Sequence, residues 1–339
     1  MHTEADLAVQ AELLEGVSRS FAFTNPQLPE SLRHATANAY LLCRIADTIE
    51  DDPGLPFARK KEFSQRLTAM VGDSEDPQAF AGDLGAVLSP DVRAKDRELV
   101  ARASLVMRVN RALPQAQRQA LARCVGIMAT GMTEFQGQRG LAGLADLRQM
   151  ERYCYFVAGV VGEMLTELFC DYSARIEALR ERLMPLAVSY GQGLQMTNIL
   201  KDIWEDRRRG ACWLPRDVFL AEGVDPARLP EERRNPGFAI ALAQLIGIAR
   251  GHLDKALAYI KLLPADETGI RRYCLWATGM AVLSLRRIHD NPHFSSEREV
   301  RISRSQVRGV IVSTSAWARF NPALSLLFAW LGRSLPSGS

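Results

Sequence analysis

Histidine and paired cysteine, which supply most transition-metal sites in proteins, are scarce in this sequence. The chain of 339 residues has five histidines, and none of them follows a glutamate by three positions. The Glu-x-x-His ligands of a helical di-iron site are therefore missing. The cysteines form no C-x-x-C pair, so we expect free thiols in a reducing compartment rather than disulfides or a zinc site. They are Cys43, Cys124, Cys154, Cys170, Cys212 and Cys274.

Long apolar runs, a leader segment and a strong net charge are missing as well. The run that comes closest to a membrane span, Pro322–Leu331, is shorter than the roughly 18 residues that a spanning helix needs. The N-terminal residues Met1–Asp6 are acidic and lack the apolar centre of a signal peptide, so a cytoplasmic protein is expected. A net charge of only +3 argues against nucleic acid as a partner.

Strand-like alternation of apolar and polar residues is hard to find, and helical periodicity dominates the chain. Proline and glycine mark the breaks between the predicted helices. These span residues 5–18, 30–50, 58–71, 93–111, 115–136, 145–172, 176–207, 236–262, 268–289 and 304–320. Because no linker, repeat or low-complexity tract interrupts them, we predict a single all-α domain over residues 1–339, ending in an apolar helix and a disordered tail.

Two acidic clusters lie in stretches that otherwise predict amphipathic helices. Residues three and four apart share one face of a helix, so each cluster forms a polar patch. Like charges at this spacing cost roughly 0.2–0.5 kcal/mol per pair, and more when they are desolvated, so positive partners are expected. The first patch consists of Asp47, Glu50 and Asp51, and the second of Asn198, Asp202, Glu205 and Asp206, with Gln195 extending its stripe.

Oxygen donors alone favour a hard cation such as Mg²⁺ at these patches. Zinc would lack histidine or cysteine partners, and a Ca²⁺ loop needs turns rather than a helix face. Mg²⁺ completes its shell with water and substrate phosphates, so two acidic faces predict several Mg²⁺ ions that hold a diphosphate between them. Arg19, Arg44 and Lys201 are candidates to bind the phosphates.

Small residues interrupt two of the apolar helices, at Ala158, Gly159 and Gly162 and again at Gly191 and Gly193. A glycine inside a helix costs about 1 kcal/mol relative to alanine, so each needs a reason. Close packing of helices is one explanation and the one we favour. Room for an apolar ligand along the bundle is the other.

Four ordered motifs resemble the squalene/phytoene synthase family. They are Ser18–Ala22 (SRSFA), Tyr40–Asp52 (Y-x-x-x-R-x-x-D-T-x-E-D-D), Tyr153–Gly162 (Y-C-x-x-V-A-G-x-V-G) and Gln195–Asp206 (Q-x-T-N-I-x-x-D-x-x-E-D). The resemblance implies one helical domain with a central cavity, in which two farnesyl diphosphates condense head-to-head with Mg²⁺ through presqualene diphosphate. Squalene synthases of the family then reduce the cation with NADPH. Dehydrosqualene and phytoene synthases lose a proton instead, and presqualene diphosphate synthases stop earlier.

The resemblance also implies roles for individual residues. The metal ligands would be Asp47, Glu50, Asp51, Asn198, Asp202 and Asp206. Catalysis would fall to Asp47, Asp51, Asp202, Asp206, Tyr40 and Tyr153, and substrate contacts to Phe21, Phe156, Gln195, Asn198 and Tyr273. Aromatic faces stabilise cations, although a packed core aromatic explains these rings equally well. Arg301 and Arg304 resemble a basic segment that holds the NADPH phosphates, and this favours squalene synthesis over the alternatives.

Three features depart from the family pattern or extend it. Phe156 stands where relatives often have a tyrosine, so Tyr153, Tyr155 or the released diphosphate would accept the proton. Ser303 replaces a basic residue in the segment assigned to NADPH. The apolar stretch Trp317–Trp330 is interpreted either as a peripheral membrane contact or as a helix that closes the bundle, and we expect a monomer.

Overall fold

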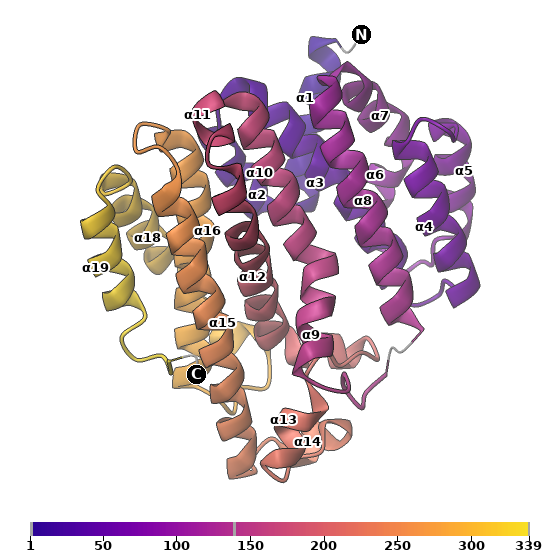
Figure 1. Ribbon diagram of the computed structural model, residues 1–339. Coiled ribbons are helices and arrows are strands. Elements are labelled where there is room, and N and C mark those ends of the chain that lie inside the picture. The colour runs from indigo at the N-terminus through magenta and orange to yellow at the C-terminus, as the bar shows by residue number, and fades with distance from the viewer. Residues whose placement is uncertain (1–2, 138–139, 338–339) are drawn as a thin grey trace. The chain divides into compact units, whose positions relative to one another are not determined.

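The computed structural model describes residues 3–137 and 140–337, except for the side chains of Arg19 and Ser20, and Figure 1 shows it as an assembly of helices. Across these residues there is no β-strand, and a single isolated bridge joins Leu144 to Pro215. The all-α fold class is therefore confirmed. The chain divides into two compact units, Met1–Gln138 with Glu163–Arg180, and Arg139–Gly162 with Glu181–Ser339, and each is described by itself.

The first unit is organised around α3, which packs against α1, α4, α6, α7 and α8. Its apolar positions, such as Leu41, Ile45 and Ile49, are completely buried. This amphipathic pattern is what holds a long helix in a core. The helices of the unit are α1 (Glu4–Val17), α2 (Arg19–Thr24), α3 (Glu30–Asp51), α4 (Phe57–Val71), α5 (Pro77–Val87), α6 (Ala94–Ala101), α7 (Ala103–Ala112), α8 (Gln115–Gln136), the greater part of α10 (Val160–Tyr172) and α11 (Ala174–Glu177), with a 3₁₀ turn at Asn25–Gln27.

Two buried charged side chains fix the C-terminal end of α3. The carboxylate of Asp52, only 1% exposed, accepts hydrogen bonds from the backbone N–H groups of Gly54 and Ser89, both at 2.8 Å. The buried Lys60 ammonium donates to the carbonyl of Glu50. Carbonyls in the last turn of a helix have no partner within the helix, and a cation there also favours the helix dipole. The backbone that carries the first acidic cluster is therefore anchored at its end.

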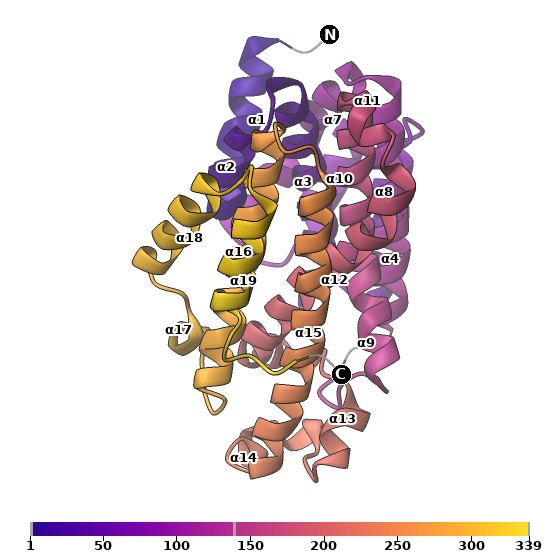
Figure 2. The same ribbon diagram turned by 60° about the vertical axis from the view of Figure 1, so that its left-hand side comes forward.

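The second unit contains α16 packed against α15, α18 and α19, as the orange and yellow helices of Figure 2 show. Helix α12 packs against α15 as well. A Cβ added to Gly193 would lie only 3.0 Å from the side chains of His252 and Leu253 on α15. The helices of this unit are α9 (Leu147–Cys154), α12 (Arg180–Arg208), α13 (Arg216–Ala221), α14 (Leu229–Glu232), α15 (Pro236–Leu262), α16 (Thr268–Asp290), α17 (Glu297–Val300), α18 (Arg304–Ala316) and α19 (Asn321–Leu331), with a 3₁₀ turn at Pro226–Arg228.

Close helix packing explains the glycines of α12 and of the segment before Glu163. A Cβ on Gly162 would lie 2.1 Å from the carbonyl oxygen of Ala187, and one on Gly191 would lie 2.1 Å from that of Ala158. Only glycine allows backbones to approach this closely. The segment facing α12 is itself irregular, since Tyr155–Gly159 form a π-helical turn between α9 and α10. The packing interpretation of these two glycines is thus confirmed.

Most predicted helix boundaries agree with the structure within a few residues. The prediction of one helix over 93–111 is wrong, because Arg102, with φ −100° and ψ 15°, separates α6 from α7. The helix predicted over 304–320 ends already at Ala316. Near the chain end, Leu335 is buried and its carbonyl accepts a 2.6 Å hydrogen bond from Arg250. Six helices were not predicted as separate elements, namely α2, α5, α11, α13, α14 and α17.

One helical run is more apolar than the sequence-based expectation of no membrane-spanning segment allows. Leu147–Tyr172 is long and apolar enough to cross a membrane by length and composition, with a mean hydropathy of 1.3. The expectation that no segment reaches this threshold is therefore wrong. More than half of the apolar 18-residue segment in this run, 56%, is buried within the protein, as in the core helix of a water-soluble fold. The six cysteines are free thiols, and all except Cys43 are buried.

Candidate active-site residues

The first acidic motif presents an accessible polar stripe along α3. Tyr40, Arg44 and Asp47 are partly exposed and Asp51 is exposed, whereas the residues between them are mainly buried. Their spacing of three and four residues places them on one helix face, as predicted. Glu50 is not part of this stripe. It is only 8% exposed, and its Oε1 accepts a 3.1 Å hydrogen bond from Gln136 of α8.

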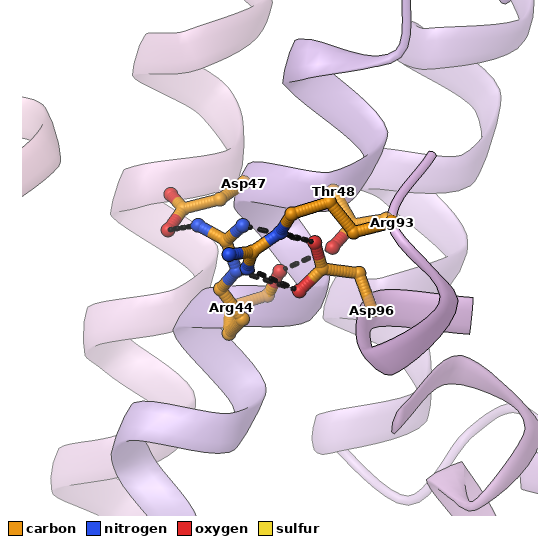
Figure 3. A network of polar contacts seen from close by, with 5 residues as sticks. All are labelled: Arg44, Asp47, Thr48, Arg93 and Asp96. Atoms are coloured by element: carbon orange, nitrogen blue, oxygen red, sulfur yellow. Dashed lines mark hydrogen bonds and ion pairs between the residues drawn. The ribbon is translucent and has the colours of Figure 1, made fainter. Parts of the chain in front are cut away.

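Arg44 is held by a carboxylate that the motif does not contain. Its Nε and Nη2 donate to the two oxygens of Asp96 on α6, both at 3.0 Å, and its Nη1 lies 3.7 Å from Oδ2 of Asp47. Arg93 donates to the same two oxygens of Asp96, at 2.7 and 3.0 Å. Thr48 donates its hydroxyl to the Arg44 carbonyl. Figure 3 shows the Arg44 guanidinium between the two carboxylates.

Asp47 occupies an unfavourable place for a negative charge. Burial raises its pKa to about 7, Arg44 opposes this shift, and the neighbouring charges of Asp51 and Asp96 add to it. The side chain is still 38% exposed. A carboxylate that is desolvated in this way gains from a cation that approaches through its exposed side. A metal ion at this position would therefore stabilise the negative charge of Asp47.

An aromatic pair lies at the other end of the same stripe. The ring of Phe21 on α2 stacks on Tyr40 with a centroid distance of 4.5 Å and an angle of 27° between the planes. Burial raises the pKa of the Tyr40 hydroxyl, which favours its neutral form. Phe21 thus lies against Tyr40, which shares its helix face with Asp47. Arg19 begins α2, but its side chain lies outside the described part of the chain.

The second acidic motif forms a similar stripe on α12. Gln195, Asp202 and Asp206 are partly exposed and Asn198 is exposed. The residues between them are mainly buried, among them Met196, Thr197, Ile199, Leu200 and Ile203. The amide and carboxylate side chains thus share the accessible face of an otherwise buried helix, as their spacing predicts.

Asp202 and Glu205 of the second acidic motif differ in their charged neighbours. Lys201 lies with its Nζ 3.3 Å from Oδ2 of Asp202, and burial raises the pKa of Asp202 in spite of that ammonium group. Glu205 is paired with Arg208 and Arg209 instead, and Arg208 lowers its pKa. Asp202 is therefore the carboxylate that would gain more from a metal cation.

Nowhere in the residues that the structure describes do three Asp, Glu, His or Cys side chains gather so that they could hold a metal ion. Mg²⁺ does not need such a group, because it commonly takes one or two carboxylates and completes its shell with water and phosphate oxygens. The partly or fully exposed oxygen donors are those of Asp47 and Asp51 on α3 and, in the other unit, those of Asn198, Asp202 and Asp206 on α12. The donors of each helix, taken by themselves, are of the kind that Mg²⁺ prefers.

The aromatic residues of the third motif have partners that the sequence did not reveal. Tyr153 is buried and stacks on Trp213 with a centroid distance of 4.1 Å and nearly parallel rings. Phe156 lies in the π-helical turn with the Arg152 guanidinium 5.5 Å above its ring. Trp213 is thus a candidate site residue that sequence reasoning missed, and its only local signal was an aromatic residue between Cys212 and Leu214.

Two arginines near the start of α18 differ from the other basic candidate residues in their exposure. Arg301 and Arg304 are exposed, and no hydrogen bond or ion pair joins either guanidinium to another residue in the described part of the chain. Ser303 between them is the N-cap of α18, where its hydroxyl accepts from the N–H of Gln306. Tyr273 on α16 is almost completely buried.

Comparison with known proteins agrees with the four motifs. The family model of squalene/phytoene synthases matches residues 14–306, and the chain therefore belongs to this family. The squalene synthase of Eremothecium gossypii is 28% identical over 293 residues, which cover 85% of this chain and 63% of that protein. The chain thus spans a little over three fifths of the length of this curated relative.

Solved structures show the same fold at lower identity. A complex of TcSQS with the ligand BPH1237 superposes with a TM-score of 0.79 and 22% identity, covering 99% of this chain and 94% of the other. A dehydrosqualene synthase in complex with a ligand has a TM-score of 0.67 and 19% identity, with coverages of 93% and 96%. The helical fold of the family is therefore confirmed for this chain.

Proposed function

We propose that the protein condenses two farnesyl diphosphates head-to-head through presqualene diphosphate and reduces the product to squalene with NADPH. The observation that carries this proposal is the pair of accessible acidic stripes, with Asp47 and Asp51 on α3 and Asp202 and Asp206 on α12. Each stripe lies in a motif that the family shares. The relative from Eremothecium gossypii is named a squalene synthase, which supports the same product.

The proposed chemistry assigns separate tasks to the residues. Mg²⁺ would be held by Asp47, Asp51, Asn198, Asp202 and Asp206. When bound, it supplies a Lewis acid for the departing diphosphate. Lys201 would bind a phosphate oxygen, as would Arg19. Arg44 differs, because its guanidinium fork is already engaged by Asp96. Glu50, which contacts Gln136, would act on the metal only after a change of that contact.

Aromatic and amide side chains would control the hydrocarbon part of the substrate. The faces of Phe21 and Tyr40 would stabilise an allylic cation, since aromatic rings attract cations. Phe156, Gln195 and Tyr273 would contact the prenyl chains. Where the reaction ends in proton loss, the proton would go to Tyr153, which stacks on Trp213, to Tyr155 or to the released diphosphate. Exclusion of water from such a surface protects the cation from hydrolysis.

Incubation with farnesyl diphosphate and Mg²⁺, with and without NADPH, tests the proposed reaction. We expect squalene with NADPH and presqualene diphosphate or dehydrosqualene without it, identified by mass spectrometry. Arg301→Ala together with Arg304→Ala should lower squalene formation about tenfold or more while sparing presqualene diphosphate, because a charge-assisted hydrogen bond to phosphate contributes about 1.5–3 kcal/mol. Both guanidinium groups are exposed and available for such contacts.

Arg308→Ala, on the exposed face of the same helix, is the matched control and should leave the product ratio unchanged. Unchanged squalene yield in the double variant would remove the NADPH assignment. A product without reductant dependence in the wild type would instead favour the dehydrosqualene, phytoene or presqualene diphosphate alternative.

We also propose that α18 and α19 contact the surface of an anionic bilayer. Five large apolar side chains of this region are exposed, namely Val312, Trp317, Phe320, Leu326 and Trp330. From residue 300 onward the sequence has five arginines and no acidic residue. Tryptophan favours the membrane interface, and each basic residue near an anionic surface contributes about 1 kcal/mol. Peripheral binding would suit a hydrocarbon product, while a monomeric state and a cytoplasmic location stay predictions.

Leu326→Glu should weaken binding to vesicles that contain phosphatidylglycerol by about tenfold, since burying a leucine contributes about 1.5–3 kcal/mol. Vesicle flotation measures the bound fraction. Ile240→Glu is the control, because Ile240 is an exposed apolar residue of α15 outside this surface. Equal flotation of the wild type and both variants would contradict a bilayer contact at α19.

A further inference from the structure

Both oxygens of the Asp96 carboxylate accept hydrogen bonds from two arginines. Arg44 donates two hydrogen bonds at 3.0 Å and Arg93 donates two more at 2.7 and 3.0 Å. A carboxylate offers about four acceptor positions, so none remains for other donors. Asp96 itself is 4% exposed, and the two guanidinium groups lower its pKa. The three side chains form a fixed group with one net positive charge.

This group meets Asp47 through a single long contact. The Nε and Nη2 of Arg44 are turned toward Asp96, so that only Nη1 faces Asp47, at 3.7 Å from its Oδ2. No hydrogen bond joins the Asp47 carboxylate to another described residue (Figure 3). The positive charge therefore lies beside Asp47 without occupying its oxygens. Residues three apart on a helix are neighbours, so Arg44 would reach Asp47 directly if Asp96 did not hold it back.

We infer that Asp96 is a positioning residue for metal binding by Asp47: it holds the Arg44 guanidinium away from that carboxylate, which leaves the carboxylate oxygens open to a divalent cation. This inference rests on the proposed function, because it takes Asp47 as a metal ligand. Residues that orient a metal ligand typically change metal affinity 10–100-fold when they are replaced. Asp96 acts through Arg44 and touches neither substrate nor metal.

Asp96→Asn removes the charge that holds Arg44 but keeps the size of the side chain. The freed guanidinium would pair with Asp47 and compete with the cation. We expect binding of Mn²⁺ in the presence of inorganic pyrophosphate, measured by electron paramagnetic resonance, to weaken about tenfold or more. The Mg²⁺ concentration for half-maximal turnover should rise by the same factor, with much of kcat recovered at saturating Mg²⁺.

A double-mutant cycle separates positioning from a merely structural role. In the Arg44→Met background no guanidinium can close on Asp47, so Asp96→Asn should change Mn²⁺ affinity less than about twofold. Asp96→Glu keeps the charge on a longer side chain and should weaken binding only about threefold, which provides a second variant should Asp96→Asn fail to fold. Circular dichroism reports the folding of each protein.

Asp6→Asn is the matched control, because Asp6 is also a nearly buried aspartate paired with an arginine, Arg108 at 2.7 Å, in the same unit. It should affect stability but not Mn²⁺ binding. Mn²⁺ affinity within twofold of the wild type in both Asp96 variants would overturn the inference, as would an equal loss in the Arg44→Met background. If the wild type itself binds no Mn²⁺ with pyrophosphate, the proposed function fails instead.

Discussion

An enzyme with Asp47→Asn is expected to release pyrophosphate from farnesyl diphosphate about a thousandfold more slowly than the wild type at saturating Mg²⁺, since loss of several kcal/mol of metal-assisted stabilisation corresponds to that factor. The amide keeps the shape of the side chain but removes the charge that would bind the cation. In the wild type, the Asp47 carboxylate has a pKa of about 7 and is partly exposed, which shows that its neighbours supply too little positive charge to stabilise it. A continuous pyrophosphate assay measures the effect.

Asp202→Asn should have an effect of the same size, because Asp202 holds the corresponding position on the stripe of α12. Glu205→Gln on the same helix serves as the control, since its carboxylate is paired with Arg208 and Arg209. We expect a change of less than about threefold for it, in line with the small contribution of exposed ion pairs. Near-normal turnover of Asp47→Asn or Asp202→Asn would remove that residue from the metal site.

The largest expected loss of stability follows from Gly191→Ala. The added Cβ would lie 2.1 Å from the carbonyl oxygen of Ala158, 2.5 Å from its carbonyl carbon and 2.9 Å from the Cα of Gly159. These are backbone atoms, so no side chain can move aside and the two helical segments must separate. Overpacking of a core typically costs 1–3 kcal/mol and sometimes more, and we expect about 3 kcal/mol here. Thermal unfolding should then shift downward by about 6 °C or more.

Gly251→Ala is the control for this substitution. Gly251 lies inside α15 of the same unit, and a Cβ there would meet nothing within 4 Å. Alanine has the higher helix propensity, so this variant should gain about 0.5–1 kcal/mol. Comparison of the two midpoints by circular dichroism isolates the helix contact from the general effect of replacing a glycine. Equal midpoints would show that α12 does not pack so closely against Ala158.

The helix faces were predictable from the sequence, whereas the partners across helices were not. Spacing alone placed Asp47 with Asp51, and Asn198 with Asp202 and Asp206, because a helix repeats every 3.6 residues. Glu50 shares the same spacing yet is buried against Gln136, 86 positions away along the chain. Only tertiary packing decides which side of a helix is covered, and periodicity within a single helix does not contain that information.

Arg44 illustrates the same limit for charge. The sequence indicated a phosphate ligand one turn before the acidic cluster, but its bidentate partner Asp96 comes from α6, 52 positions later. Ser303 shows the reverse situation, since a purely local pattern in the sequence indicates its role. The pattern Ser303-Arg304-Ser305-Gln306 is a capping box, and the structure confirms both of its hydrogen bonds. Ser303 therefore starts α18.

The π-helical turn Tyr155–Gly159 between α9 and α10 lets the helix continue but changes the direction in which the side chains after it point. A π turn contains about one residue more than an α turn, and each added residue rotates everything beyond it by about 100°. Tyr153 stacks on Trp213 before the turn, and Gly162 contacts Ala187 after it. The length of the chain at this point therefore sets the angle between the aromatic contact and the packing contact, while the helix axis stays continuous. An α-helical turn formed by the same residues would rotate Gly162 relative to Tyr153 without altering the residues of either contact.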